Sequence, residues 1–486
     1  MTFPVHTGRT QVASLIPALV FMLLVPATVL SAQTTDEQQD AAGEAAEVFE
    51  AEVEGYEQAD RASRRAQEEE WRETLRFGID VQVAELLSTL ANERIETMAD
   101  DIVLLLSENR SSRVIERAIA YFQAIGDPRG EESARAVVNA FDTRTETTVL
   151  EAIRYLSRTV TEPEDATLEV LRTAVEFAGE RVAAEAALAL GRLGDASSIP
   201  DLQRVFDRRE SVAVRGNIML SFGEMGPAAD DAVEWLISLA ESGAQSNTVR
   251  YYAVDALGKI GNADAVPNIR ALMSADDGMM RAYALSALLA LEADDLDTAL
   301  LAAIRDDNWR VRQLAVEGMG DSGDTSHVPA VSFVARRDPD HRVRRSALRS
   351  LADLGTADAW DTIRSLMLSQ GAPHESRVFA VELLAEQPAR DTTDAFVELF
   401  TMEESNRDVR LVQQLARSAS TMEHRTLDAL YGMLLSHRDT AVRTYAIRGI
   451  RLNRIGSFRE ELETLSETGG GPAALRRAVE QALEDI

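Results

Sequence analysis

The side chains that most often perform chemistry are few in this 486-residue sequence and widely spaced. The chain has no cysteine, which excludes a disulfide framework, a thiolate metal site and a cysteine nucleophile. No two histidines stand three or four residues apart, the spacing that places two metal ligands on one helix face. The sequence also lacks a glycine-rich phosphate loop and a nucleophile elbow. We therefore predict no catalytic, cofactor-binding or metal-binding residue. The six histidines are His6, His327, His341, His374, His424 and His437.

Arginine is the charged side chain whose spacing is regular. From Arg215 onward it recurs every 31 to 35 residues, with acidic residues a few positions earlier, such as Asp277 before Arg281 and Asp338 before Arg344. An arginine at the start of a helix can pair with such an acidic turn or donate to its carbonyl oxygens. The alternative is an anion-binding ladder, but we favour a structural role that ties neighbouring units together. The ladder positions are Arg215, Arg250, Arg281, Arg312, Arg344, Arg377, Arg410 and Arg443.

The residues around each arginine have helical periodicity. In the unit that contains Arg250, Val249 and Ala253 belong to one apolar helix face. Gly261 is placed to end this helix, and Pro267 lies near the start of the next one, where a missing N–H does no harm. Each unit therefore consists of two helices, and a regular stack of such units is a solenoid.

The signature Val-Arg-x-x-Ala-x-x-Ala-Leu-Gly resembles that of the HEAT repeat family, in particular the short repeats also known from phycobilisome lyases. Residues 249–258 and 182–191 are the best copies, and the resemblance extends from about Val81 to Leu483. It implies an all-α fold, namely an α-α superhelix or right-handed solenoid of about twelve two-helix HEAT-like repeats. Such a signature says much about the fold and little about function.

The resemblance also implies two enzyme functions as alternatives, because two classes of enzyme contain HEAT repeats. The di-iron deoxyhypusine hydroxylases use several His-Glu dipeptides on successive helices, whereas this chain has one, His374-Glu375, which precedes Arg377 rather than following it. A single dipeptide cannot ligate two irons. Bilin lyase chemistry has no support from any other feature of the sequence. We therefore expect no enzyme activity and no cofactor, with an enzyme or metal-binding HEAT protein as the alternative.

The first residues have the three parts of an export signal. Arg9 precedes the apolar stretch 12–30, and the small residues Ser31 and Ala32 follow it. We expect residues 1–32 to be a signal peptide that is cleaved near Ala32. An uncleaved membrane anchor is the alternative, because the apolar stretch is nearly long enough to span a bilayer. The prediction is an exported protein, periplasmic or extracellular, without a membrane span in the mature chain and without the cysteine that a lipoprotein needs.

The next segment is acidic and rich in Glu, Ala and Gln. We expect residues 33–76 to form a partly helical or disordered tether, with a docking helix for a partner as the alternative, and residues 77–486 to form the solenoid. The formal net charge of the chain is -31, which repels nucleic acid at long range. We therefore expect protein partners and no nucleic acid.

A solenoid presents a long face whose variable positions can specify a partner, so we predict a non-catalytic protein-binding scaffold. Side chains one and five residues after the repeated arginine should point away from the packed helix face. Two of them also belong to a run of arginines between 305 and 349, which is either a basic patch for an acidic partner or a set of ladder and turn residues offset by aspartates. The predicted partner-binding residues are Tyr251, Asp255, Gln313, Glu317, Arg345, Arg349, Thr444 and Arg448.

Overall fold

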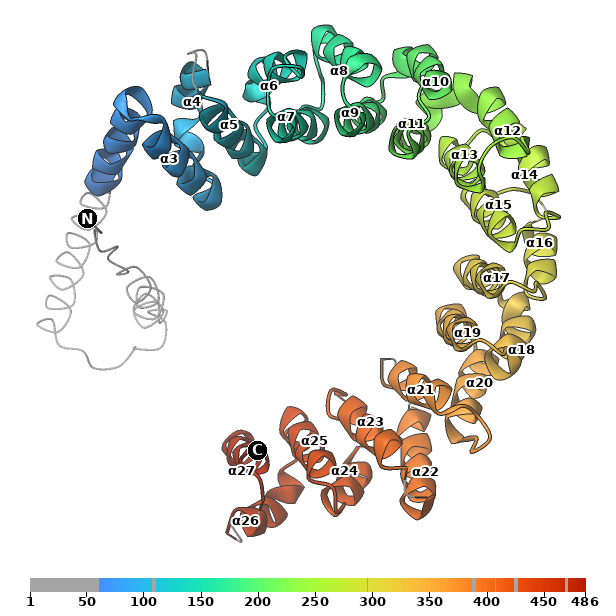
Figure 1. The fold of residues 1–486 in the computed structure, drawn as a ribbon. Coiled ribbons are helices and arrows are strands. Elements are labelled where there is room, and N and C mark those ends of the chain that lie inside the picture. The colour runs from blue at the N-terminus through green and yellow to red at the C-terminus, as the bar shows by residue number, and fades with distance from the viewer. Residues whose placement is uncertain are drawn as a thin grey trace, which may run out of the picture. The chain divides into compact units, whose positions relative to one another are not determined.

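Helices joined by short turns form the described part of the chain, in which no residue belongs to a strand (Figure 1). The chain divides into two compact units, Met1–Ile125 and Gly126–Ile486. The predicted signal peptide and residues 33–60 of the predicted tether lie outside the described residues. No described helix is both long and apolar enough to cross a membrane. The computed structural model describes residues 61–106, 111–294, 296–386, 390–406, 408–423, 427–467 and 471–486.

The described part of the first unit begins with residues 61–77, which are helical and include the end of the predicted tether. Leu75 is buried in this segment, and Arg72 Nε lies 3.2 Å from Asp101 Oδ2 in α4. This segment therefore packs within the first unit, where it contacts α4. The remaining elements are α3 (Asp80–Glu93), η1 (Glu96–Met98), α4 (Ala99–Leu106) and α5 (Ser112–Ile125).

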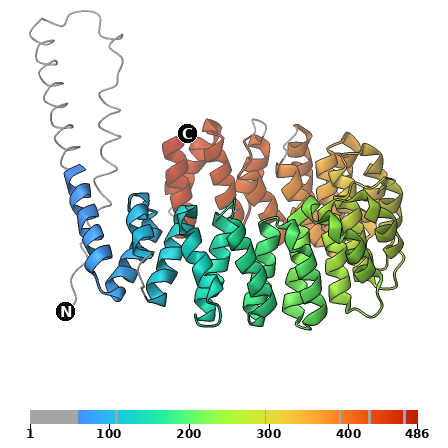
Figure 2. The same cartoon turned by 90° about the horizontal axis from the view of Figure 1, so that it is seen from above.

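The second unit is a stack of helical hairpins arranged in two rows (Figure 1), and the helices of successive hairpins lie side by side in Figure 2. The odd-numbered helices from α7 to α27 form the inner row, on the concave side of the curve, and the even-numbered helices from α6 to α26 form the outer row. Each inner helix packs against its outer partner and against the next inner helix. The prediction of an all-α superhelix of two-helix repeats is confirmed.

The bounds of the elements in the second unit follow the chain order. They are η2 (Pro128–Gly130), α6 (Glu131–Asn139), α7 (Glu146–Thr159), α8 (Asp165–Phe177), α9 (Glu180–Arg192), η3 (Ala196–Ser198), α10 (Ile199–Arg208), α11 (Val212–Met225), η4 (Gly226–Ala232), α12 (Val233–Glu241), α13 (Asn247–Ile260), η5 (Ala263–Ala265), α14 (Val266–Leu272), α15 (Gly278–Ala290), α16 (Leu296–Ala303), α17 (Trp309–Asp321), η6 (Thr325–His327), α18 (Val328–Arg337), α19 (His341–Leu354), α20 (Ala357–Leu368), α21 (His374–Glu386), α22 (Arg390–Asn406), α23 (Val409–Ala419), α24 (Asp428–Leu435), α25 (Thr440–Leu452), η7 (Gly456–Phe458), α26 (Arg459–Glu467) and α27 (Ala473–Asp485).

Local sequence sets the ends of these helices, as α13 illustrates. The Ser246 side chain accepts a hydrogen bond from the Val249 amide and caps the N-terminus. Gly261, with φ of 82°, ends the helix in the left-handed conformation that favours glycine. Pro267 lies in the first turn of α14, and Ala253 is fully buried on the predicted apolar face. The predicted hairpin is therefore observed, with Gly261 and Pro267 in their predicted roles, and Ser246 is a cap that the sequence analysis did not name.

Small residues of the signature let neighbouring inner helices approach closely. A Cβ added at Gly258 of α13 would lie 2.8 Å from the Cα of Ala287 in α15. A Cβ at Gly191 of α9 would lie 2.5 Å from the Cα of Ser221 in α11. No larger residue fits at these two crossings without moving the backbone of the next helix. At these two crossings, glycine is therefore required by the spacing of the inner helices.

Candidate protein-binding face

The repeated arginine joins consecutive hairpins. The Nε and Nη2 of Arg312 donate to the Asp338 carboxylate at 2.7 and 3.0 Å, and its Nη1 donates to the carbonyl oxygens of Asp306 and Asp307 at 2.8 and 3.1 Å. Arg281 makes a matching two-point contact with the Asp306 carboxylate, with both distances 2.7 Å. The turn before each arginine thus provides carbonyl oxygens, and the turn of the next hairpin provides the carboxylate.

The carboxylate of Asp306 shows the electrostatic effect of this contact. Burial by itself raises the pKa of Asp306, but the hydrogen bonds from Arg281 and from the Asn308 amide outweigh that effect. Its pKa therefore lies below the usual value, and the charged form is favoured in the folded chain.

Arg344 occupies the same slot but makes different contacts. Its Nη1 donates to the carbonyl oxygens of Asp338 and Pro339 at 2.8 and 3.1 Å, and its Nε donates to Ser376 Oγ at 3.3 Å. The carboxylate of Glu375 is exposed and lies 3.7 Å from its Nη2. Arg344 therefore does bind the acidic turn that precedes it, through main-chain carbonyl oxygens rather than through a carboxylate.

The other ladder positions vary more widely. Arg377 lies 2.6 Å from the buried carboxylate of Glu403, an ion pair without hydrogen-bond alignment. Arg410 is exposed, and the buried Nε of Arg443 has no hydrogen-bond acceptor among the described residues. In α11 and α13 the arginines donate from Nε to carbonyl oxygens: Arg215 to Phe206 and Arg209, at 3.1 and 2.7 Å, and Arg250 to Ala240, at 2.9 Å.

Tyr251 and Asp255 lie half-buried on the inner face of α13. The Tyr251 ring stacks on that of Tyr283 in α15, with centroids 5.1 Å apart and planes at 11°. Its hydroxyl donates to the Asp277 carboxylate. Burial, followed by the Asp277 bond, raises the pKa of Tyr251 to about 12. Asp255 pairs with Lys259 at 2.8 Å.

Gln313 and Glu317 lie one helical turn apart on α17. Glu317 Oε1 accepts from Gln313 Nε2 at 2.8 Å and from Ser346 Oγ of α19 at 2.7 Å. These bonds fix the Glu317 carboxylate and connect the inner face of α17 to that of α19.

Arg345 and Arg349 are exposed, but they are not free side chains. Their guanidinium carbons lie 3.7 and 5.4 Å from the ring centroid of Phe379 in α21. Arg345 Nη2 is 3.9 Å from Glu382, and Arg349 Nη1 is 2.7 Å from Glu386. Both arginines are exposed, and each also covers an aromatic ring and ties α19 to α21.

The last pair of predicted surface positions, Thr444 and Arg448, differs in exposure. Arg448 is exposed and lies 5.7 Å from the centroid of the Tyr445 ring. Thr444 is only 8% exposed, and its hydroxyl donates to the Thr440 carbonyl oxygen at 2.7 Å. The prediction that Thr444 points away from the packed face is wrong, because its short side chain turns back onto its own helix.

The run of arginines between 305 and 349 does not form one surface. Arg312 and Arg344 are buried in the ladder, while Arg336 of the outer row donates to Thr362 and Ser365. Arg342 lies over the Trp309 ring at the start of α17, with its guanidinium carbon 3.3 Å from the ring centroid. The run therefore has members in the ladder, on the outer row and on the inner row.

A cavity of about 290 Å³ opens between α15 and α17 on the inner row. Its lining includes two of the predicted residues, Gln313 and Glu317, together with Arg310 of the arginine run, and five residues that the sequence analysis missed. A signal for it was present in the sequence: the two slots that follow Arg281 hold the small residues Ala282 and Ser286. The cavity is lined by Met279, Ala282, Tyr283, Ser286, Arg310, Gln313, Leu314 and Glu317.

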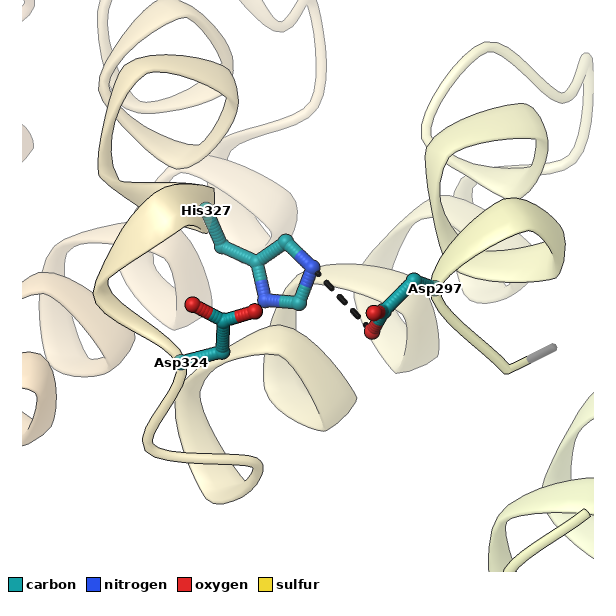
Figure 3. Close-up of side chains that lie close together, drawn as sticks. All are labelled: Asp297, Asp324 and His327. Atoms are coloured by element: carbon teal, nitrogen blue, oxygen red, sulfur yellow. Dashed lines mark ion pairs between the residues drawn. The ribbon is translucent and has the colours of Figure 1, made fainter. Parts of the chain in front are cut away.

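One histidine lies near two carboxylates (Figure 3). The buried His327 has its Nε2 3.4 Å from Asp297 Oδ1, and one ligand atom of each of Asp297, Asp324 and His327 lies within 4.8 Å of the others. The two carboxylates approach opposite sides of the imidazole, and Asp324 already accepts a hydrogen bond from the Ser326 amide at 2.8 Å. A metal ion needs ligand atoms that converge at about 2.0–2.2 Å. This arrangement fits an ion pair between α16 and η6 better than a metal centre.

The other described histidines lie on separate hairpins. His374 Nδ1 is 3.0 Å from Asp408 Oδ2, while the side chain of the adjacent Glu375 faces Arg344. The His-Glu dipeptide thus contributes to two different contacts between hairpins. His341 is exposed, and the buried His437 accepts a hydrogen bond from the Asp439 amide at 3.0 Å. His6 and His424 lie outside the described residues.

Two solved structures with a similar course of the chain differ widely from it in sequence. The crystal structure of the karyopherin Kap121p bound to the extreme C-terminus of the protein phosphatase Cdc14p is 14% identical, with a TM-score of 0.47. The match covers 85% of this chain and 53% of that one, so this chain spans about half the length of the karyopherin. The complex of CpcE and CpcF of phycocyanin lyase from Nostoc sp. PCC7120 is 20% identical over 48% of this chain and 92% of that one, with a TM-score of 0.31.

The comparison with curated proteins gave no match. A family model described as Spirochaete HEAT repeat protein matches residues 75–481. The matched range begins inside the helical segment 61–77 and ends in α27, so it includes the hairpins of both units. The chain belongs to the Spirochaete HEAT repeat protein family.

Proposed function

We propose that this chain is a non-catalytic protein-binding scaffold and that the inner row from α13 to α21 is its binding face. HEAT-repeat solenoids in general support protein binding through such extended faces. The observation that carries the proposal is the set of aromatic and arginine side chains that lie across neighbouring inner helices, beside an open cavity.

Tyr283, Trp309, Arg310 and Arg342 illustrate this composition. The guanidinium carbons of Arg342 and Arg310 lie 3.3 and 5.2 Å from the Trp309 ring centroid, and Tyr283 stacks on the tyrosine of the preceding inner helix. Tryptophan, tyrosine and arginine are the residues most enriched among those that dominate protein–protein binding energies. The stacks also hold the rings in place, which lowers the entropy lost when a partner binds.

Affinity capture with the full chain tests this proposal. Trp309→Ala combined with Arg342→Ala alters the inner row, and Phe333→Ala combined with Arg337→Ala is a matched control, because Phe333 and Arg337 are an exposed aromatic and an exposed arginine on outer helix α18. We expect the inner variant to lose proteins that the parent and the control retain. Equal capture by all three contradicts the inner face as the binding face. Stoichiometric iron or zinc in the purified protein would instead support the metal-enzyme alternative.

We further propose that the protein is exported to the periplasm or the exterior. The support is the sequence of residues 1–32, with Arg9, the apolar stretch and the small residues before Gln33. N-terminal sequencing of the mature protein should begin close to Gln33. An intact Met1 in a cytosolic fraction contradicts export.

A further inference from the structure

We infer that the cavity between α15 and α17 is an anchor pocket for one apolar side chain of a partner polypeptide, and that a carboxylate next to that side chain pairs with Arg310. The inference rests on the proposed protein-binding function and specifies the chemistry of the segment that binds.

The cavity exists because two inner-face slots of α15 are nearly empty. One and five residues after the ladder arginine, α15 has Ala282 and Ser286. The neighbouring inner helices have longer side chains in both slots. These are Tyr251 and Asp255 in α13, Gln313 and Glu317 in α17, and Arg345 and Arg349 in α19.

The grooves on either side are closed by side chains. Between α13 and α15 the stacked rings of Tyr251 and Tyr283 fill the space. Between α17 and α19 the Ser346 hydroxyl bonds Glu317 at 2.7 Å. Helix α11 also has a small residue in its first slot, Gly216. A Cβ added there would lie 3.5 Å from the Tyr252 ring of α13, so this ring occupies the space beside it. Short residues thus leave a cavity where no neighbouring ring fills the space.

The walls of the cavity determine what fits inside. Tyr283, Leu314 and Met279 contribute apolar surface to its lining, beside small side chains, and methionine adapts its shape to different occupants. Its volume of about 290 Å³ is at the lower end of the range for pockets that hold small molecules. One leucine-sized or phenylalanine-sized side chain matches this space better than a larger organic ligand.

Charge places the carboxylate on one side of the opening. Arg310 is exposed on the rim, and it makes no ion pair with a carboxylate in the described part of the chain. Glu317, seven residues further along α17, is held by Gln313 and Ser346 and repels a second carboxylate. The segment that complements both features has its apolar residue in the cavity and an acidic residue beside Arg310. Burial of the apolar side chain then provides most of the affinity, and the rim pair mainly provides specificity and salt dependence.

Short peptides test the pocket directly. The probes are the N-acetylated, C-amidated pentapeptides Gly-Gly-Leu-Asp-Gly, Gly-Gly-Ala-Asp-Gly and Gly-Gly-Leu-Lys-Gly, and binding to the full chain is followed by saturation-transfer NMR. We expect the Leu-Asp peptide to bind, and the Ala-Asp peptide to bind about tenfold more weakly, because a shorter side chain buries less apolar surface. The Leu-Lys peptide should bind less well than the Leu-Asp peptide at low salt. Absence of Leu-Asp binding at millimolar peptide overturns the inference.

Two variants assign the binding to this cavity. Ser286→Tyr fills it at a site where the parent side chain is exposed, and it should abolish binding of the Leu-Asp peptide. Ser238→Tyr, at an exposed serine on outer helix α12, is the matched control and should leave binding and melting temperature unchanged. Arg310→Glu should reverse the preference, so that the Leu-Lys peptide binds better than the Leu-Asp peptide. Peptide binding that persists in Ser286→Tyr overturns the inference.

Failure of the pocket and failure of the scaffold give different results. If Ser286→Tyr still captures the proteins that Trp309→Ala with Arg342→Ala loses, the inner face binds partners and the anchor pocket is refuted. If the parent captures no protein that depends on the inner row, the scaffold proposal itself fails.

Discussion

The ladder in α15 to α19 and the ladder in α23 to α25 have the same residue in the same slot but very different contacts. In the middle of the second unit, Arg281 and Arg312 each pair at two points with a carboxylate of the next hairpin and also bind carbonyl oxygens of the preceding turn. Toward the C-terminal end, Arg410 is exposed, and the Nε of Arg443 is buried without an acceptor among the described residues. The slot alone therefore determines neither whether the arginine is buried nor what it binds.

One difference between the two regions is a residue that lies after the arginine. Asp306 follows Arg281 by 25 residues, and Asp338 follows Arg312 by 26. Ser436 occupies the corresponding position after Arg410. An acid at this spacing is not sufficient, however. Asp276 stands in the same relation to Arg250, which donates instead to a carbonyl oxygen.

Removal of a fully paired ladder arginine should have the largest effect. Arg312→Ala leaves the Asp338 carboxylate buried without its partner and should cost about 3–5 kcal/mol. Hydrogen exchange should report lost protection in α17 to α19, with distant hairpins unchanged, because each repeat contacts only its neighbours. Uniform loss of protection along the second unit would count against this local role.

Arg344→Ala should have a smaller effect, about 1.5–3 kcal/mol, because it removes charge-assisted bonds to carbonyl oxygens but leaves no buried carboxylate. Hydrogen exchange in α19 measures this loss of stability, for comparison with the loss caused by Arg312→Ala.

The double replacement of Arg345 and Arg349 by Ala is the surface comparison, with a loss of about 0–1 kcal/mol expected for each exposed pair. If the double variant loses as much stability as Arg344→Ala, the ladder position and the exposed positions do not differ in their structural role.

Acid should weaken the middle of the ladder. The folded-state pKa of Asp306 is lowered, so its contribution is complete above the unfolded pKa of about 3.9 and is lost as the pH falls through the lower, folded value. The melting-temperature difference between the parent and Asp306→Asn should be constant near neutral pH and shrink below about pH 4. The neighbouring exposed Asp307 gives the control Asp307→Asn. A difference that stays constant in acid contradicts the assignment.

The sequence predicted the hairpins because their period and caps depend on local physics. Val249, Ala253, Gly261 and Pro267 each act within a few residues of their own helix. The side-chain contacts of the inner face could not be predicted in the same way. Whether Arg345 is free depends on its contact with Phe379 in the next hairpin. The position of Arg345 relative to the ladder arginine of its own helix does not encode this contact.

The cavity was missed for a related reason. Small residues such as Ala282 and Ser286 are a visible signal, but Gly216 in the first slot of α11 has no cavity beside it, because a tyrosine from the next helix occupies the space. Local sequence thus determines the frame, and contacts between neighbouring hairpins determine which parts of its surface are open.

The smallest expected effect lies at the C-terminal end and tests the spacing rule itself. Arg410→Ala should change stability by no more than about 0.5 kcal/mol, because the side chain is exposed. Ser436→Asp places an acid 26 residues after Arg410, the separation of Arg312 and Asp338, at a position that is also exposed. It should stabilise α23 and α25 by up to about 1 kcal/mol, the value of a surface ion pair. A double-mutant cycle of the two changes isolates their coupling. A coupling energy of zero, with both helices intact by hydrogen exchange, would show that an acid at the correct spacing is not sufficient for a ladder contact. Burial of the pair, as for Arg312 and Asp338, would then be the additional requirement that the middle of the unit meets.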